Sequence, residues 1–241
     1  MSAAAAPELD TLVVIPAHDE AATVLAAVTA VRAAADHAGA LVHLIVVADA
    51  CSDATAALAR EAGAEVLEID AHNVGAARAA GFRHGLRATA PGPGSLRPGS
   101  QTAAPWLATT DADSQVPLDW FSRQSAHRNR GADVVIGTVS LDPRVGKDAL
   151  GRAWACDYTG KFIAGGHGHI HGANLAFSAE SYREVQGFRS LEADEDVDLV
   201  HRFRAAGARI ATATDMPVLT SRRTNGRVPR GFAQTLAALP A

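Results

Sequence analysis

Apolar and polar positions form two kinds of pattern along the first ninety residues. Short runs of apolar, often β-branched residues are separated by longer, alanine-rich segments. The short runs predict strands at Leu12–Ile15, Val42–Val47 and Glu65–Ile69. The longer segments predict helices from about Glu20 to Ala38, from a cap at Ser52 or Asp53 to about Ala62, and over Val74–Arg87. This alternation is typical of βαβ units and a parallel sheet.

The pattern changes after residue 88. Residues 88–105 are rich in Pro, Gly and Ser without apolar periodicity, which predicts a mobile surface insertion. Beyond it we expect strands at Trp106–Thr110, Val134–Val139 and Ile210–Ala213, an extended segment at Ile170–Ser178, and helices at Val116–Arg130, Lys147–Ile163 and Asp194–Ala206. The basic stretch 217–241 predicts a closing flap that ends in a short helix. We therefore expect one α/β domain over residues 1–241.

Composition limits the partners and the compartment. The chain has 22 basic and 26 acidic residues, a formal charge of −4, so no overall positive field attracts it to nucleic acid or anionic lipid. No run approaches the ~20 apolar residues of a membrane-spanning helix, and the N-terminus lacks a signal-peptide pattern. The two cysteines, Cys51 and Cys156, lack disulfide-framework or metal-site spacing. We expect a soluble, cytoplasmic protein with no integral membrane segment and no nucleic-acid partner.

Acidic residues follow three of the predicted strands. Asp19 and Glu20 follow the first strand, Asp49 the second, and Asp111 and Asp113 the fourth. Because ligands of open α/β sheets bind at the carboxyl ends of the strands, these side chains are expected at one edge. An Asp-x-Asp pair there suits a divalent cation that grips a diphosphate, since both carboxylates offer hard oxygen ligands.

Six short motifs occur in order along the chain. They are Val-Ile-Pro-Ala-His-Asp-Glu at 14–20, Val-Val-Ala-Asp-Ala-Cys-Ser-Asp at 46–53, Asn-Val-Gly-Ala-Ala-Arg at 73–78, Asp-Ala-Asp at 111–113, Gly-Ala-Asn at 172–174, and Glu-Asp-Val-Asp-Leu at 195–199 with Arg202. Together, over Leu12 to Gly207, they resemble the family 2 glycosyltransferases. The resemblance implies the GT-A fold, with a Rossmann-like, mostly parallel sheet flanked by helices. The sequence departs from the family at Ala48, which occupies the position of the first of two adjacent aspartates that the family usually has.

The resemblance also implies a function. It predicts metal-dependent transfer of a sugar, with inversion, from a UDP- or GDP-linked donor to an unidentified acceptor hydroxyl. The nucleotide would be held by Pro16, Ala17, Glu20, Asp49, Arg78 and Asp111. Mg²⁺ or Mn²⁺ would be bound by Asp113 and Asp111, with His171 as a conceivable third ligand. Asp196, in the Glu195-Asp196 pair, would be the general base that takes the proton of the acceptor hydroxyl.

Structural roles compete with these assignments. Asp49 and Asp53 are also suited to capping a helix, and Asp19, Glu20 and the acidic cluster 192–198 to a first helical turn, where the macrodipole favours negative charge. Asp111 and Asp113 would equally suit a turn before Pro117. Arg78 would equally suit a solvated helix face. The alternating histidines His167, His169 and His171 share one face of an extended segment and line an acceptor cleft in the competing interpretation.

Aromatic and basic residues allow similar alternatives. Trp120, Trp154 and Tyr158 either stack on a sugar or acceptor or belong to the core. Four arginines near the C-terminus either close over the diphosphate or form a solvated loop; they are Arg222, Arg223, Arg227 and Arg230.

Other functions remain open at this stage. A nucleotidyltransferase also uses a metal and an α/β sheet, but the chain has no Gly-rich loop with Lys after the first strand. A dinucleotide dehydrogenase would need a Gly-x-Gly-x-x-Gly turn at that position, which is absent. A protein that binds a nucleotide sugar without turnover is a third alternative, suggested by the altered segment Ala48-Asp49-Ala50.

Overall fold

The computed structural model describes residues 11–88, 105–141, 154, 158–160, 162–163 and 166–222. The predicted insertion at 88–105 lies almost wholly outside these residues, and so do Cys156, residues 223–241 and most of the predicted helix Lys147–Ile163.

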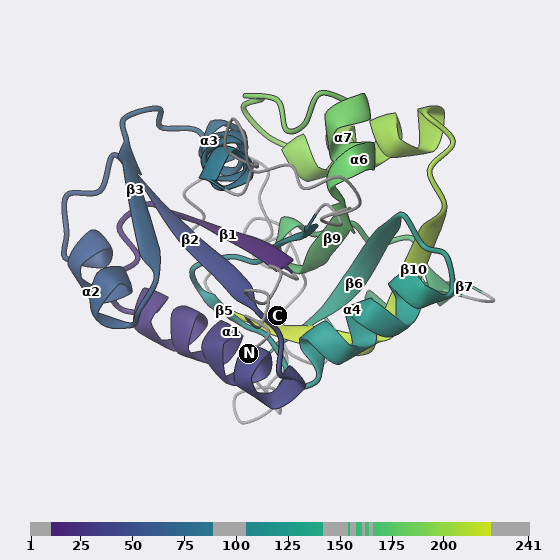
Figure 1. The fold of residues 1–241 in the computed structure, drawn as a ribbon, viewed down its shortest axis with the longest axis horizontal. Helices are drawn as coiled ribbons and strands as arrows, with labels where there is room; N and C mark the ends of the chain where they lie inside the picture. The colour runs from purple at the N-terminus through teal and green to yellow at the C-terminus, as the bar shows by residue number, and fades with distance from the viewer. Residues whose placement is uncertain are drawn as a thin grey trace, which may run out of the picture.

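The N-terminal half alternates strand and helix as the pattern predicts (Figure 1). Its elements are β1 (Thr11–Ala17), α1 (Val24–Ala38), β2 (Val42–Asp49), α2 (Thr55–Glu61), β3 (Glu65–Ile69) and α3 (Val74–Ala88). α1 ends at Gly39, whose φ of 62° is a left-handed conformation that glycine adopts without steric cost. All three predicted strands and all three predicted helices are confirmed, and the helices α1 and α2 begin later than expected.

The C-terminal half is less regular. Its elements are β4 (Trp106–Thr109), β5 (Ser114–Gln115), α4 (Trp120–Asn129), β6 (Val134–Leu141), β7 (Phe162–Ile163), β8 (Gly166–His167), the 3₁₀ turn η1 (Gly172–Asn174), β9 (Leu175–Ser178), α6 (Ala179–Glu184), α7 (Glu195–Ala205) and β10 (Ile210–Thr220). The predicted strands at β4 and β6 and the predicted helices at α4 and α7 are confirmed with shifted ends.

Three expectations for this half were wrong, and one helix was missed. Residues 162–163, expected at the end of a helix, form strand β7, paired with β8. The segment Ile170–Ser178 is interrupted by η1, and α6 was not predicted. β10 extends to Thr220, so residues 217–220 of the expected flap belong to the sheet. A register shift between Ala213 and Val218 lets the strand continue through Pro217, which cannot donate a ladder hydrogen bond.

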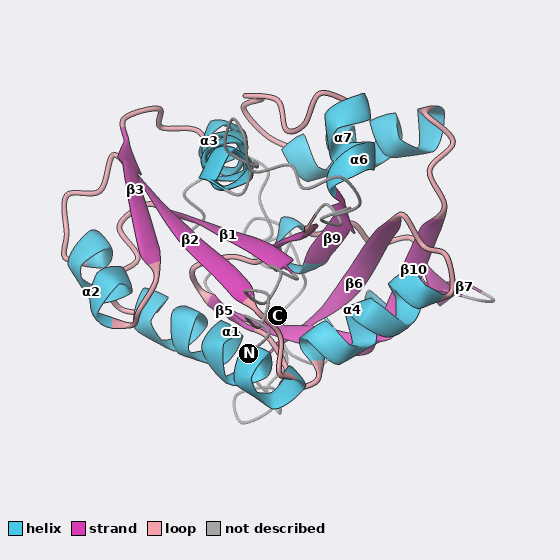
Figure 2. Ribbon diagram, in the orientation of Figure 1, coloured by secondary structure: helices cyan, strands magenta, loops and turns pink. Residues whose placement is uncertain are grey.

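Eight strands form one twisted sheet in the order β3-β2-β1-β4-β9-β6-β10-β5. β3, β2, β1 and β4 are parallel to one another, and β10 is parallel to β6. β9 is antiparallel to both of its neighbours, and β5 is antiparallel to β10. Figure 2 shows α3, α6 and α7 over one face of the sheet and α1, α2 and α4 over the other.

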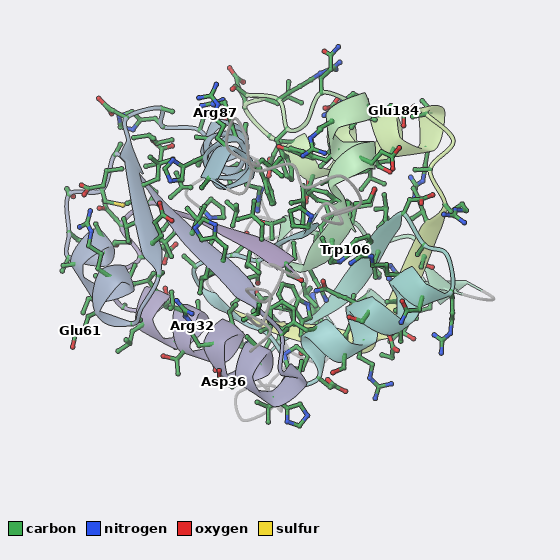
Figure 3. The ribbon with its side chains drawn as sticks, in the orientation of Figure 1. Arg32, Asp36, Glu61, Arg87, Trp106 and Glu184 are labelled. Atoms are coloured by element: carbon green, nitrogen blue, oxygen red, sulfur yellow. The ribbon has the colours of Figure 1, made fainter. Side chains whose placement is uncertain are left out.

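Alternating side chains of β1 supply both halves of the core. Val13 and Ile15 pack with residues of α1 and α4, whereas Leu12 and Val14 pack with residues of α3 and α7. In Figure 3 Trp106 lies inside the molecule, while Glu184 lies at its periphery. Two apolar layers therefore hold the strand ends in fixed positions. Over the described ranges, none of the helices combines the length and the apolar character needed to span a bilayer.

Candidate active site

Asp49, at the carboxyl end of β2, is buried and holds a loop through its carboxylate. Oδ1 accepts the backbone N–H groups of Ala71 (2.6 Å) and His72 (2.9 Å), and Oδ2 accepts that of Asn73 (2.7 Å). Asn73 Nδ2 donates to the carbonyl oxygen of Leu191 at 2.7 Å. Asp49 therefore fixes the loop between β3 and α3 and, through Asn73, links it to the segment before α7.

The end of β1 contacts the segment between β2 and α2. Pro16 and Ala17 are the last residues of β1 and pair with β2. Glu20 is buried; its N–H donates to Thr55 Oγ1 at 2.7 Å, and its Oε2 accepts from Thr23 Oγ1 at 3.0 Å. The backbone N–H of Ser52 donates to Asp19 and lowers the pKa of that carboxyl. The N-cap of α2 is Ala54, while Asp53, one residue earlier, accepts the N–H of Thr55 through Oδ1 at 2.9 Å and that of Ala21 through Oδ2 at 3.0 Å.

Three non-glycine residues with strained backbone conformations follow the strands at this edge of the sheet. Asp19, Ala50 and His72, which follow β1, β2 and β3, have φ of 50°, 51° and 47°. Non-glycine residues in this conformation cost roughly 1–3 kcal/mol each and cluster at functional sites. His18 Nδ1 donates to the carbonyl oxygen of Asp49 at 2.7 Å, and the rings of His18 and His72 meet edge to face, 5.9 Å apart. These contacts hold the strained turns together.

Arg78, in α3, lies at the centre of a buried ionic cluster. Its Nη1 donates to Glu195 Oε1, its Nη2 donates to Asp111 Oδ1 at 2.6 Å, and its Nε donates to Thr109 Oγ1 at 3.3 Å. The guanidinium also lies over the ring of Phe188, 5.6 Å from its centroid. The side chain of Arg78 is only 3% exposed. Its charge therefore serves two carboxylates of the protein, and the solvated-face alternative is wrong.

Asp196 is held by two backbone amides. Its Oδ2 accepts the N–H of Gly172 at 2.6 Å and its Oδ1 accepts the N–H of Val197 at 2.8 Å. Burial raises the pKa of Asp196, the neighbouring Glu195 raises it further, and Arg78 opposes both. A carboxylate with a raised pKa and a fixed plane is suited to accepting a proton.

Asp111 and Asp113 follow β4 as predicted. Burial raises the pKa of Asp111 to about 6, although Arg78 acts in the opposite direction. Asp111 Oδ1 is engaged by Arg78, and Asp113 Oδ1 accepts a long hydrogen bond from Ser114 Oγ at 3.4 Å. Both side chains are partly exposed. Two partly exposed carboxylates at a strand end are a donor set that fits Mg²⁺ or Mn²⁺.

A different group of metal-ligand atoms is the most compact. Among the described residues, the one set of three His, Cys, Asp or Glu side chains with ligand atoms within 4.8 Å of one another is Asp19, Cys51 and Asp53. His171 does not form such a set with Asp111 and Asp113. A metal site at Asp111 and Asp113 is therefore argued from those two carboxylates.

The histidine segment is organised by ring contacts. Tyr158 stacks on His169 with centroids 3.6 Å apart, and His169 stacks on His171 at 5.6 Å. His169 Nε2 donates to the carbonyl oxygen of Tyr158 at 2.8 Å, and His167 Nε2 donates to that of Ile136 at 3.1 Å. Burial lowers the pKa of His167. The rings of His169 and His171 thus lie side by side, as alternation on one face predicts.

Two of the three aromatic candidates are core residues. Trp120 is fully buried and donates from Nε1 to Asn174 Oδ1 at 2.9 Å. Tyr158 is buried, and its hydroxyl accepts the N–H of Val139 at 2.9 Å. Neither Gly172 nor Phe188 was predicted from the sequence to have a role in the site. Only the Gly-Ala-Asn motif pointed to Gly172, and nothing in the sequence distinguished Phe188 from a core residue.

Solved structures resemble this chain in fold. S. aureus TarS 1–349 in complex with UDP-GlcNAc matches with a TM-score of 0.65 and 11% identity over 92% of this chain and 61% of that chain. The mannosyltransferase PcManGT from Pyrobaculum calidifontis, in complex with GDP-Man and Mn²⁺, matches with a TM-score of 0.63 and 17% identity over 95% and 61%. Glucosyl-3-phosphoglycerate synthase from Mycobacterium tuberculosis, with Mg²⁺ and UDP, matches with a TM-score of 0.56 and 16% identity over 89% and 72%.

These likenesses confirm the predicted GT-A fold. The chain spans 61% of the length of the TarS 1–349 and PcManGT chains. No curated protein matches it in sequence. The family model described as glycosyl transferase family 2 matches residues 12–184, well over half of the chain. The chain therefore belongs to glycosyl transferase family 2.

Proposed function

We propose that this protein transfers a sugar from a UDP- or GDP-linked donor to an acceptor hydroxyl, with inversion at the anomeric carbon. The observation that carries the proposal is the meeting of Asp111, from the end of β4, with Glu195 and Asp196, from the start of α7, around Arg78. The carboxylates to which we assign donor and acceptor roles therefore surround the same guanidinium. The nucleotide sugars and metal ions named for the similar structures support the same proposal.

The residues divide between donor and acceptor. Asp113 and Asp111 would hold Mg²⁺ or Mn²⁺, which when bound neutralises charge on the diphosphate leaving group. The nucleotide would be bound by Pro16 and Ala17 at the end of β1 and by Glu20 just after it. As the sequence predicts, Asp49, Arg78 and Asp111 would complete this site. Asp196 would take the proton of the acceptor hydroxyl, since its partly buried carboxylate has a raised pKa. Catalysis would then depend on orientation and charge stabilisation.

Donor binding is tested by thermal unfolding with UDP or GDP, each with and without Mn²⁺. We expect Tm to rise only when nucleotide and metal are both present, because a ligand of the folded state stabilises it. Asp113→Asn should abolish this rise, while Asp36→Asn, an exposed change on α1, should keep it. Stabilisation by NAD, or by none of these nucleotides, would contradict the proposal.

Turnover is tested by hydrolysis of the donor sugar without acceptor. We expect release of a nucleoside diphosphate, and Asp113→Asn should lower the rate at least about a hundredfold, since a metal supplies several kcal/mol of charge stabilisation. Release of pyrophosphate from a nucleoside triphosphate would indicate a nucleotidyltransferase. Metal-dependent binding without any turnover would indicate a binding protein.

A further inference from the structure

Gly172 and Arg78 meet at a junction of four segments that are far apart in sequence. Arg78 comes from α3, Asp111 follows β4, Gly172 begins η1, and Glu195 and Asp196 begin α7. Figure 1 shows α3 and α7 on the same face of the sheet. The guanidinium lies between the carboxylates of Asp111 and Glu195, and the amide of Gly172 reaches Asp196. The junction therefore connects the donor side of the site to the acceptor side.

No side chain fits at position 172. A Cβ there would lie 2.7 Å from Cζ and 2.9 Å from Nη1 of Arg78, and closer still to Nη2. Moving these atoms aside would break the hydrogen bonds that Nη1 and Nη2 donate to Glu195 and Asp111. Gly172 is not among the residues with positive φ, so its backbone does not itself require glycine. The requirement at this position is for space next to Arg78.

The main chain at Gly172 also supplies an N–H group that holds the Asp196 carboxylate. With both carboxylate oxygens receiving an N–H, the plane of the Asp196 carboxylate is set by Gly172 on one side and by Val197 on the other. Val197 is the next residue on α7, so its amide moves together with Asp196. The contact from Gly172 is the one that relates the carboxylate to a different part of the fold.

We propose that Gly172 is a positioning residue for Asp196, and that the guanidinium of Arg78, packed into the space where a side chain would be, keeps the Gly172 amide in place. The inference rests on the proposed function, in which Asp196 is the base. A shift of about 1 Å in a reacting group can cost up to roughly a hundredfold in rate. Gly172 is thus needed for turnover while making no contact with the donor through a side chain.

The test compares Gly172→Ala with a matched glycine. Gly85→Ala also creates a close contact, with a Cβ 2.5 Å and 2.6 Å from the two methyl groups of Leu12, but it lies in the core between α3 and β1. For each variant we would measure Tm, the dissociation constant of UDP or GDP with Mn²⁺, and kcat for sugar transfer or donor hydrolysis. Gly172→Ala should lower kcat about ten- to a hundredfold with nucleotide affinity within threefold of the wild type. Gly85→Ala should lower Tm and leave kcat within twofold.

A second comparison, with Gly172→Ala made in the Arg78→Lys variant, tests whether Arg78 obstructs a side chain at position 172. Lysine lacks the Nη atoms, so in Arg78→Lys the change Gly172→Ala meets less obstruction and should reduce kcat by less than threefold relative to Arg78→Lys alone. If Gly172→Ala folds only in this background, the obstruction by Arg78 is demonstrated directly. Failure to fold in both backgrounds, or equal rate losses in both, would overturn the link to Arg78.

The remaining outcomes separate the two proposals. A Gly172→Ala protein that keeps kcat within twofold, or that loses nucleotide affinity in parallel with kcat, contradicts a positioning role for Gly172 while leaving the proposed function intact. A wild-type protein that binds no nucleotide and turns over no nucleotide sugar contradicts the proposed function, and the inference fails with it.

Discussion

Two arginine–carboxylate contacts in this protein differ mainly in their surroundings. Arg78 joins the buried Glu195 and the partly exposed Asp111, with its own side chain only 3% exposed. Arg209 donates to both oxygens of Asp133 near the surface, with the arginine side chain 70% exposed. Removing one partner of a buried pair leaves an uncompensated charge, whereas an exposed pair is replaced by water. Burial, more than geometry, therefore decides which contact holds the fold together.

Removing the buried guanidinium should have the largest effect. Arg78→Met leaves Glu195 buried without its cation, and we expect the free energy of unfolding to fall by about 3–5 kcal/mol. Urea denaturation followed by circular dichroism measures it. A loss below about 1 kcal/mol would show that the buried cluster contributes no more than a surface pair.

Removing the Asp49 carboxylate should have an intermediate effect, because its partners are neutral amides. Asp49→Ala leaves the N–H groups of residues 71–73 without an acceptor, and we expect a loss of about 1–3 kcal/mol. Asp70→Ala, at a side chain that is 85% exposed next to the same loop, is the control and should change stability by less than about 0.5 kcal/mol. Equal losses in the two variants would refute the ranking by burial.

The exposed pair should give the smallest effect and a distinct pH dependence. Hydrogen bonds from Arg209 lower the pKa of Asp133, so the folded state favours the ionised carboxylate. Its stabilisation is present above the ordinary carboxyl range, near pH 4, and is lost as pH falls through the lowered pKa. Asp133→Asn should cost about 0.2–1 kcal/mol at pH 7, less in high salt, and progressively less as the pH falls below about 4. A cost that is independent of both pH and salt would contradict an electrostatic contribution.

The sequence predicted the N-terminal half better than the C-terminal half for a physical reason. β3 occupies the predicted residues Glu65–Ile69. Gly63 before the strand and polar residues after Ile69 mark its two ends in the sequence. In the C-terminal half, strand pairing between distant segments overrides the structure that the local sequence pattern predicts. The strand predicted at Ile210–Ala213 continues as β10 through Pro217 to Thr220, with a register shift against β6.

The candidate site was predictable only in part. The positions of Asp49, Asp111 and Asp113 follow from the rule that polar residues after parallel strands share one edge. The partners of Arg78 could not be predicted, because Glu195 lies 117 residues away and meets it only when α3 and α7 pack on the same face. The Gly-Ala-Asn motif pointed to Gly172, but its close approach to the guanidinium of Arg78 could not be predicted, since it depends on how distant segments pack.

The most direct measurement compares sugar transfer and donor binding in Asp196→Asn, with Asp194→Asn, an exposed neighbour, as the matched control. A general base contributes about 10²–10⁴ in rate, so Asp196→Asn should lose at least about a hundredfold in kcat while UDP or GDP binds with Mn²⁺ within threefold of the wild-type affinity. Asp194→Asn should behave as the wild type. Transfer by Asp196→Asn within tenfold of the wild-type rate would contradict the assignment of the base, and with it the account of how the buried junction serves catalysis.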